Sequence, residues 1–389
     1  MNSQQPSVLF SLGFRPFFLL ASFFSVFTIL LWTIVYSFDW SVQTEFLDHT
    51  QWHAHEMIYG YAMAVVAGFL LTAVKNWTGI DTISGRPLLL LVMVWVSARL
   101  MPFIDYENSF YIMAVLDCLF FIALIIALSI PVFKVRQWKQ LGVLSKILLI
   151  LVSNILFYLG MAGYVPEGVR WGLYAGIYLI LALVFMMARR VIPFFIEKSL
   201  GGSVRIKNSR VLDISSLIFF LVFMLADIIQ PGGLLVVVMA AILLLLHSAR
   251  LYGWYCNAMW QHPMLWVLYI AYIFMVLGFA LKISTWYFGV SPYLSLHAFT
   301  YGGIGLMTLG MMTRVALGHT GRDVNNPPCL MPWAFFILLI GAVSRVLLPL
   351  IDLTYYSVWI FIAQICWVSA FSIFFISFLS ILTRTGIHD

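Results

Sequence analysis

The chain has 389 residues, of which 63% are hydrophobic, 17% aromatic and only 9% charged. Soluble domains carry roughly 25% charged residues, so this composition excludes a soluble globular protein and indicates a membrane protein. The net charge of +6 does not indicate a nucleic-acid partner, because in so apolar a chain basic residues mark the loops that stay in the cytoplasm.

A helix that crosses a membrane needs about 20 mostly apolar residues, because lipid offers no partners for backbone N–H and C=O groups. On this length we expect about twelve spanning helices. The fold class is therefore all-α, and the short connections predict one transmembrane helical-bundle domain over residues 1–389. The predicted segments lie near 15–37, 52–74, 87–103, 110–132, 146–163, 171–195, 211–229, 233–255, 264–287, 294–317, 331–350 and 355–381.

The charged residues of the loops predict the orientation of the chain. Two loops are basic and should be cytoplasmic: the one after the fourth segment and the one after the sixth. Their residues are Lys134, Arg136 and Lys139, then Arg189, Arg190, Lys198, Arg205, Lys207 and Arg210. The alternate loops are mainly acidic, with Asp39, Glu45, Asp48, Asp105, Glu107, Glu167 and Asp352. An even number of spans then places both the N and the C terminus in the cytoplasm.

The stretch "QWHAHEMIYGY" at 51–61 opens the second segment, on the expected outer side. At about 100° per residue, His53 shares a helix face with Glu56, whereas His55 points about 200° away from His53. His297 opens the tenth segment on the same side. Imidazole nitrogen is a ligand for copper, iron and zinc, so His53, His55 and His297 are candidate metal ligands, with Glu56 orienting an imidazole or relaying protons. The alternative is that each histidine is an ordinary hydrogen-bonded residue at a helix end.

A second group of histidines belongs to the expected cytoplasmic side. His297 and His319 are separated by roughly 33 Å of helix, about one bilayer core, so they cannot share a metal. His319 and His262 should lie at the inner face, and His247 in the inner half of the membrane. Together with Arg314 and Arg322 they are candidates for binding a cofactor and its carboxylates. For the loop arginines, the alternative is the ordinary excess of positive charge on the cytoplasmic side.

Four charged residues fall inside apolar segments: Arg99, Asp117, Asp227 and Arg345. A charge at the centre of a span costs roughly 2.5 to 3.5 kcal/mol, so these side chains should face the bundle interior and pair. We expect Arg99 to pair with Asp117, and Arg345 to meet Asp227 or a cofactor carboxylate. Glu56, Arg99 and Asp117 are the candidate catalytic residues. A buried ion pair that only fixes packing is the alternative.

The second, sixth and tenth segments end in the distinctive sequences "LTAVKNWTG", "MMARRVIPFF" and "MMTRVALGHTGR". The pattern M-M-x-R occurs at Met186–Arg189 and again at Met311–Arg314, and the second, sixth and tenth segments are four helices apart. This spacing allows a threefold repeat of four helices.

Five stretches resemble signature blocks of the NnrS family: "LGFRPFFLLA" at 12–21, "WHAHEMIYGY" at 52–61, "AGFLLTAVKNWTG" at 67–79, "RRVIPFF" at 189–195 and "HAFTYGGIGLMTLGMMTRVALGHTGR" at 297–322. The resemblance implies a protein of the bacterial inner (cytoplasmic) membrane that contains haem, of the b type, and copper. It implies an association with denitrification and with protection against nitric oxide and nitrosative stress. The expected partners are nitric oxide or a related small molecule, the lipid bilayer and an unidentified electron donor, and no nucleic acid.

Carried over by motif position, the family's residues are His53, His55, Glu56, His297, Arg314, His319 and Arg322, with Asn76, Trp77 and Arg99 as companions. One position departs from the family pattern. Tyr269, in "PMLWVLYIAY", stands where many relatives have histidine. If that position is a haem ligand in them, this chain must use another residue, and His247 and His262 are the candidates.

These observations lead to one principal hypothesis and two rivals. The principal one is a metalloprotein, in one version a nitric oxide-reducing oxidoreductase, that binds or reduces nitric oxide or relieves nitrosylated iron. The first rival is a secondary transporter of a metal ion or an anion, since twelve helices and buried charges also describe carriers. The second rival is an assembly factor that delivers haem or copper.

Overall fold

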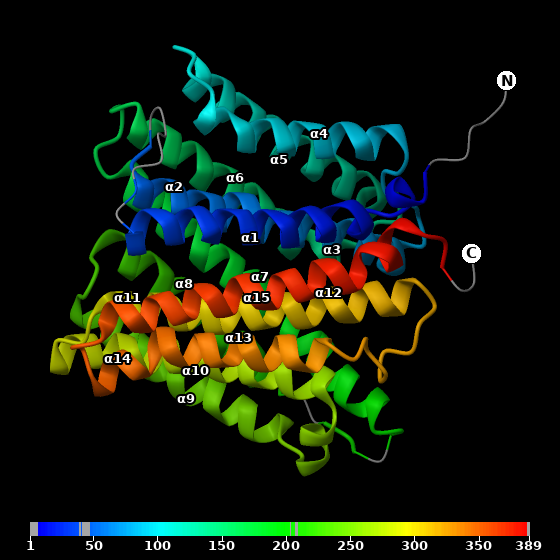
Figure 1. The fold of residues 1–389 in the computed structure, drawn as a ribbon. Coiled ribbons are helices and arrows are strands. Elements are labelled where there is room, and N and C mark those ends of the chain that lie inside the picture. Colours follow the sequence, from blue (N-terminus) through cyan, green and yellow to red (C-terminus); the bar gives the residue numbers. More distant parts are fainter. Residues whose placement is uncertain (1–6, 39, 41–46, 203, 207–208, 387–389) are drawn as a thin grey trace, which may run out of the picture. The chain divides into compact units, whose positions relative to one another are not determined.

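The computed structural model describes residues 7–38, 40, 47–202, 204–206 and 209–386 (Figure 1). Every regular element in these residues is a helix, which confirms the predicted all-α class. Asp39, Glu45 and Lys207, used above to predict orientation, lie outside the described residues.

Up to residue 199 the elements are η1 (Val8–Phe10), α1 (Phe14–Phe38), α2 (His49–His55), η2 (Glu56–Ala62), α3 (Met63–Thr78), α4 (Arg86–Leu100), η3 (Met101–Phe103), α5 (Ser109–Lys134), η4 (Trp138–Gln140), α6 (Leu141–Met161) and α7 (Gly168–Ser199). The later elements are α8 (Arg210–Ile229), α9 (Leu234–Trp254), η5 (Asn257–Gln261), α10 (Pro263–Phe288), α11 (Pro292–His297), η6 (Ala298–Gly305), α12 (Leu306–His319), α13 (Met331–Val346), α14 (Leu348–Ile351) and α15 (Tyr356–Thr383).

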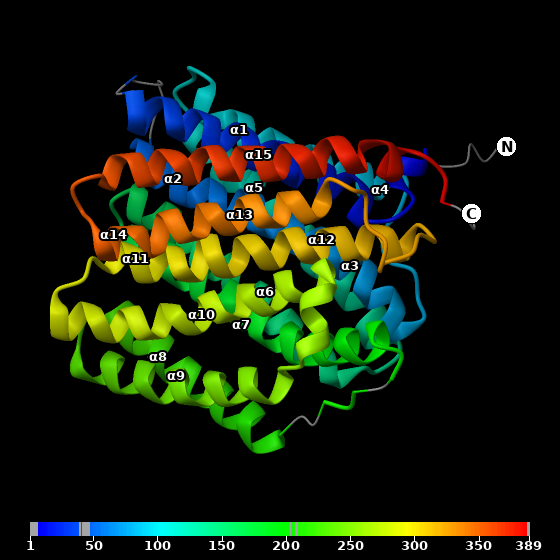
Figure 2. The same ribbon diagram turned by 60° about the horizontal axis from the view of Figure 1, so that its bottom comes forward.

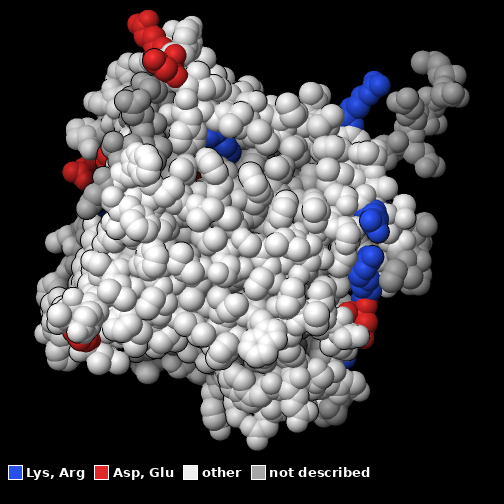
Figure 3. Space-filling model, viewed as in Figure 1, with Lys and Arg blue, Asp and Glu red and all other residues white. Residues whose placement is uncertain are grey.

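Among the described helices, eleven are long and apolar enough to cross a membrane, and they correspond to eleven of the predicted segments. The remaining prediction, 294–317, falls on α11, η6 and α12, which follow one another without a break from Pro292 to His319. Figure 3 shows that the helix sides on the face in view are largely uncharged, and that most charged side chains there lie near helix ends. The chain is therefore a polytopic membrane protein.

Contacts divide the chain into two compact units. Unit 1 consists of residues 1–179, 315–322 and 371–389, and unit 2 of residues 180–314 and 323–370. Within unit 1, α1 packs along α3, and α4 packs along α5, which in turn contacts α6. Within unit 2, α9 lies beside α10, as Figures 1 and 2 both show, and α10 also packs against η6.

The first motif, "LGFRPFFLLA", joins the two ends of unit 1. Arg15, at the start of α1, is fully buried, and its Nη1 donates to the carbonyl oxygens of Leu382 (3.2 Å) and Arg384 (2.8 Å). The last carbonyl groups of a helix have no partner within that helix, and here a guanidinium supplies one. The arginine of this motif therefore caps the C-terminal end of α15.

Two segments of π-helix interrupt the second and tenth predicted spans. Each begins directly after a histidine: η2 follows His55, and η6 follows His297. The π-helix is rare and is found frequently at functional sites. Hydrophobic periodicity did not predict these segments, because they keep the same apolar composition and change only the number of residues per turn.

Candidate functional site

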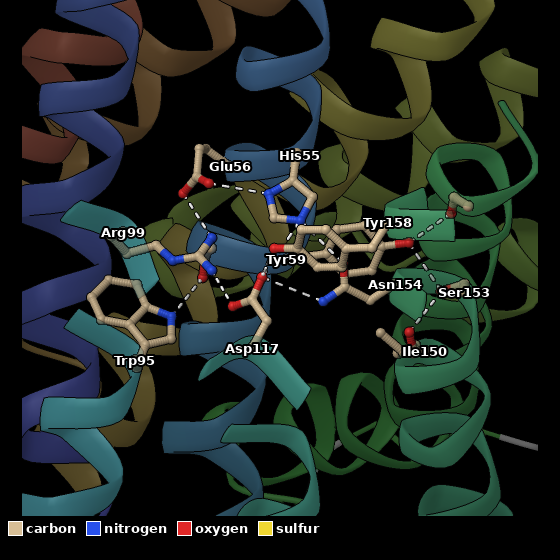
Figure 4. Close-up of polar contacts among 12 residues, drawn as sticks. His55, Glu56, Tyr59, Trp95, Arg99, Asp117, Ile150, Ser153, Asn154 and Tyr158 are labelled. Carbon is tan, nitrogen blue, oxygen red and sulfur yellow. Dashed lines mark hydrogen bonds and ion pairs between the residues drawn. The ribbon is translucent and has the colours of Figure 1, made fainter. Parts of the chain in front are cut away.

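Unit 1 contains a buried group of polar side chains, which we call the polar cluster (Figure 4). Its central members are His55, Glu56, Arg99 and Asp117, all at most 4% exposed. They come from α2, η2, α4 and α5, respectively. Four further residues surround them: Tyr59, Ser153, Asn154 and Tyr158.

Arg99 lies between the two carboxylates of the cluster. Its Nη1 donates to Glu56 Oε2 at 2.7 Å, and its Nη2 donates to Asp117 Oδ1. The predicted pair of Arg99 with Asp117 is confirmed, and Glu56 joins it. One guanidinium and two carboxylates leave one negative charge inside a spanning bundle, where an unbalanced charge is costly.

His55 is placed to supply the missing positive charge. Its Nδ1 lies 3.1 Å from Glu56 Oε1, and its Nε2 lies 3.0 Å from Asn154 Oδ1. The amide nitrogen of Asn154 donates to Asp117 Oδ2 at 3.4 Å, which leaves Asn154 Oδ1 as the acceptor that faces His55. Both ring nitrogens therefore face acceptors, as an imidazolium requires. With one proton on His55 or on Glu56, the cluster is electrically neutral.

Tyrosines complete the cluster. The Tyr158 hydroxyl donates to Asp117 Oδ2 at 2.6 Å, and the Tyr59 hydroxyl donates to the Gly172 carbonyl at 2.6 Å and lies 3.0 Å from Ser153 Oγ. Asn154, Tyr158, Tyr59 and Ser153 are not among the residues predicted from the sequence. Asn154 did carry a signal, since it is the one side-chain amide in the predicted segment 146–163.

His53 has a different environment from His55. Its ring stacks on Trp32 of α1, with centroids 4.5 Å apart and planes 13° from parallel. Helix geometry predicted that Glu56 shares a face with His53; in the structure the imidazole that Glu56 contacts is that of its sequence neighbour His55. The rotation of about 100° per residue applies within a regular α-helix, and here the α-helix ends at His55 and a π-helix begins at Glu56.

His297 lies in unit 2 and contacts Arg345. Its Nδ1 donates to the Tyr293 carbonyl at 2.8 Å, which leaves Nε2 as the acceptor for Arg345 Nη2 at 3.3 Å. The pairing of Arg345 with Asp227, one of two predicted alternatives, is wrong. Asp227 binds Lys282 Nζ at 2.9 and 2.7 Å. Lys282, which is not among the four charges predicted to be buried, also lies within a predicted span.

The family of the chain follows from comparison with known proteins. Residues 8–385 match the NnrS family, described as NnrS protein. The chain belongs to the NnrS family. No curated protein matches it. The match covers nearly the whole chain and confirms the resemblance that rested on five short motifs.

The copper predicted for this NnrS-family chain can be tested against the geometry of the histidines. A copper ligand needs an unshared lone pair on an imidazole nitrogen, but both ring nitrogens of His55 and of His297 are hydrogen-bonded to protein groups. Among the residues that the structure describes, no group of three or more His, Cys, Asp or Glu side chains is arranged to hold a metal ion. In the described arrangement these histidines do not fit a copper ion, and copper at His53, His55 and His297 stays a prediction.

The haem prediction can be tested in the same way at His247. This buried imidazole lines a cavity of about 60 Å³ between α7, α8 and α9 of unit 2. Its Nδ1 lies 2.5 Å from the Tyr272 hydroxyl, and its buried Nε2 has no hydrogen-bond partner among the described residues. The free nitrogen suits an axial ligand. However, Phe185 stacks on the ring at 4.4 Å, and the cavity has room for a few waters, not for a porphyrin.

The remaining cofactor candidates have separate local contacts in their own units. In unit 2, Arg314 lies 3.8 Å from the Phe195 ring centroid and donates to Ser199 Oγ at 3.2 Å, while His262 directly precedes α10. In unit 1, His319 Nε2 lies 3.5 Å from Asn76 Nδ2, and Arg322 Nη1 donates to the Thr320 carbonyl at 3.4 Å.

Tyr269, the position that departs from the family pattern, donates its hydroxyl to the Leu251 carbonyl at 3.0 Å. This hydrogen bond ties α10 to α9 within unit 2, so the tyrosine has a packing role at the position of the expected histidine.

Proposed function

We propose that this protein acts in the inner membrane of a bacterium to protect the cell against nitrosative stress, by binding or reducing nitric oxide or by relieving nitrosylated iron. Membership of the NnrS family supports a role related to nitric oxide. The observation that supports reduction best is the polar cluster, a set of proton-holding groups within membrane-spanning helices. Nitric oxide is small and uncharged and enters lipid by itself. Its reduction also consumes protons, which lipid cannot hold, so the protein must provide groups that carry them.

The cluster holds one transferable proton at a defined place. His55 Nδ1 and Glu56 Oε1 are 3.1 Å apart, within the range in which a proton passes directly between two groups. Arg99 binds the other oxygen of Glu56 and keeps the carboxylate in position. Asp117, bonded to Tyr158 and Asn154, fixes the opposite side of the cluster. Glu56 is therefore the residue that we propose to deliver the proton.

Electrons need a redox group. We propose haem b and copper for this role, reduced by a donor that is still to be identified; the proposal rests on the family resemblance, because the described positions of the candidate histidines fit neither group. When bound, these groups supply one-electron chemistry that amino-acid side chains cannot supply. Their metal content is therefore the first property to measure.

The test uses the full-length protein purified in detergent. We expect a haem absorption band that changes on addition of dithionite and shifts again on addition of nitric oxide, together with copper in elemental analysis. A folded protein without colour and without metal would contradict the proposal.

A secondary transporter of a metal ion or an anion is the second candidate. One observation favours it: a π-helix interrupts the second span and the tenth span at corresponding places. Carriers often bind their substrates where helices of two repeats are interrupted. Uptake of copper or of nitrite into proteoliposomes, together with a spectrum that does not respond to nitric oxide, would favour this function.

A further inference from the structure

The second and tenth spans follow one plan in both sequence and backbone. Each has a histidine as the last residue of a short α-helix, then a π-helix, then a longer α-helix. The residues after the histidine match at identical spacing. The matched pairs are His55 and His297, Tyr59 and Tyr301, Gly60 and Gly302, Gly68 and Gly310, Thr78 and Thr320, and Gly79 and Gly321.

Packing against the preceding helix repeats as well. A Cβ on Gly60 would come within 2.7 Å of Phe24 on α1, and a Cβ on Gly302 within 2.3 Å of Phe274 on α10. Eight residues further along each span, a Cβ on Gly68 would contact Phe17 and Phe18, and a Cβ on Gly310 would contact Val267 and Leu268. The contacted residues have the same spacing on α1 as on α10. The helix pair of unit 1 therefore recurs in unit 2.

The next two helices of each unit extend the repeat. The pattern L-x-P-x-I-D follows α4 as "LMPFID" at 100–105 and follows α13 as "LLPLID" at 347–352. Arg99 lies one residue before the first pattern and Arg345 two residues before the second, and each is the last residue but one of its helix. Aligning the two patterns places Gln364 at the position of Asp117, and aligning the histidines places Ala298 at the position of Glu56. The sixth span does not share the π-helix, since α7 is a continuous α-helix.

The two arginines thus lie at the same end of corresponding helices, one position apart in the alignment, but they have different partners. Arg99 binds two carboxylates, whereas the described contacts of the Arg345 guanidinium are His297 Nε2 and the Tyr356 hydroxyl, both at 3.3 Å. Among the described residues, no carboxylate lies within ion-pair distance of Arg345. Only 9% of Arg345 is exposed, so its charge lies largely out of water and has no counterion among the described residues.

We propose that Arg345, with His297 and Tyr356, binds a small planar oxyanion from solution, of the nitrite, nitrate or formate class. The anion takes the place that the chain fills with Glu56 and Asp117 in the first repeat. A guanidinium presents a planar fork of N–H donors that matches two oxygens of such an anion. The Tyr356 hydroxyl provides a further donor beside it, and His297, whose Nδ1 hydrogen is held by Tyr293, keeps the guanidinium in place.

The test is isothermal titration calorimetry of the detergent-solubilised full-length protein with sodium nitrite and sodium formate, with sodium chloride as the reference salt. We expect saturable binding of nitrite and formate at one site. Arg345→Gln should weaken it at least about tenfold, because a hydrogen-bonded charge partner is lost. Arg170→Gln, which removes the same charge from a surface ion pair with Glu167, should bind as the unchanged protein does.

A second variant keeps the test decisive if Arg345→Gln fails to fold. Gln364→Glu replaces an amide by a carboxylate at the position that the pattern alignment matches to Asp117, the acid that binds Arg99 in the first repeat. It should weaken nitrite binding, because an internal carboxylate competes for Arg345. Absence of saturable nitrite and formate binding in the unchanged protein, or undiminished binding in folded Arg345→Gln or in Gln364→Glu, would overturn the proposal.

Discussion

Lys282 of α10 holds Asp227 of α8 through both carboxylate oxygens, at 2.9 and 2.7 Å, and both side chains are largely buried within unit 2. Neither residue belongs to the polar cluster or to the proposed anion site. The pair therefore offers a measure of what a buried ion pair contributes to this bundle without affecting activity.

Lys282→Met should lower the free energy of unfolding by roughly 3 to 5 kcal/mol, because it leaves the Asp227 charge in a buried place without its ammonium partner. The double variant Lys282→Met with Asp227→Asn should recover most of this loss. The measurement is thermal unfolding in detergent, followed by circular dichroism. Lys139→Met, at an exposed position, is the control and should change little. Equal losses in the single and double variants would show that charge is not the cause.

Arg99→Gln should destabilise unit 1 by a similar amount, again roughly 3 to 5 kcal/mol. Glu56 and Asp117 then lose the guanidinium between them, and only His55 is left to balance their charge. Adding Asp117→Asn to this variant removes one of the two negative charges and should restore part of the stability. The same unfolding assay serves. Arg345→Gln removes an arginine that binds no carboxylate among the described residues. If it proved more destabilising than Arg99→Gln, the contrast between the two repeats would be wrong.

Gly302→Ala should destabilise by about 1 to 3 kcal/mol, because its Cβ would lie 2.3 Å from the ring of Phe274 and the core there has no spare room. Phe274→Leu in the same chain should relieve the clash and recover stability. Gly253→Ala is the matched control, since its Cβ meets nothing within 4 Å. No recovery in the double variant would mean that backbone conformation, and not the ring, requires the glycine.

The sequence predicted the all-α class and the positions of the spanning helices along the chain, because both follow from the length of the apolar segments alone. It also predicted the pair of Arg99 with Asp117, since charges inside spans have few partners to choose from. It did not predict that Glu56 turns to His55, because the π-helix that starts there has no signature in hydrophobic periodicity. Nor did it predict the partner of Asp227, since Lys282 lies near the end of its span, where a long side chain can also reach water.

Glu56→Gln tests the proton that the cluster holds. The amide keeps the size and a hydrogen bond to Arg99 but cannot accept a proton from His55, so nitric oxide turnover should fall by roughly 10² to 10⁴ while nitric oxide binding remains. Glu56→Asp keeps a carboxylate but increases its distance from His55 Nδ1, so its turnover should be intermediate. The assay compares the rate of nitric oxide loss with the amplitude of the nitric oxide-dependent spectral shift in the same preparation. Unchanged turnover in Glu56→Gln would remove Glu56 as proton donor, and loss of both quantities together would assign it a structural role.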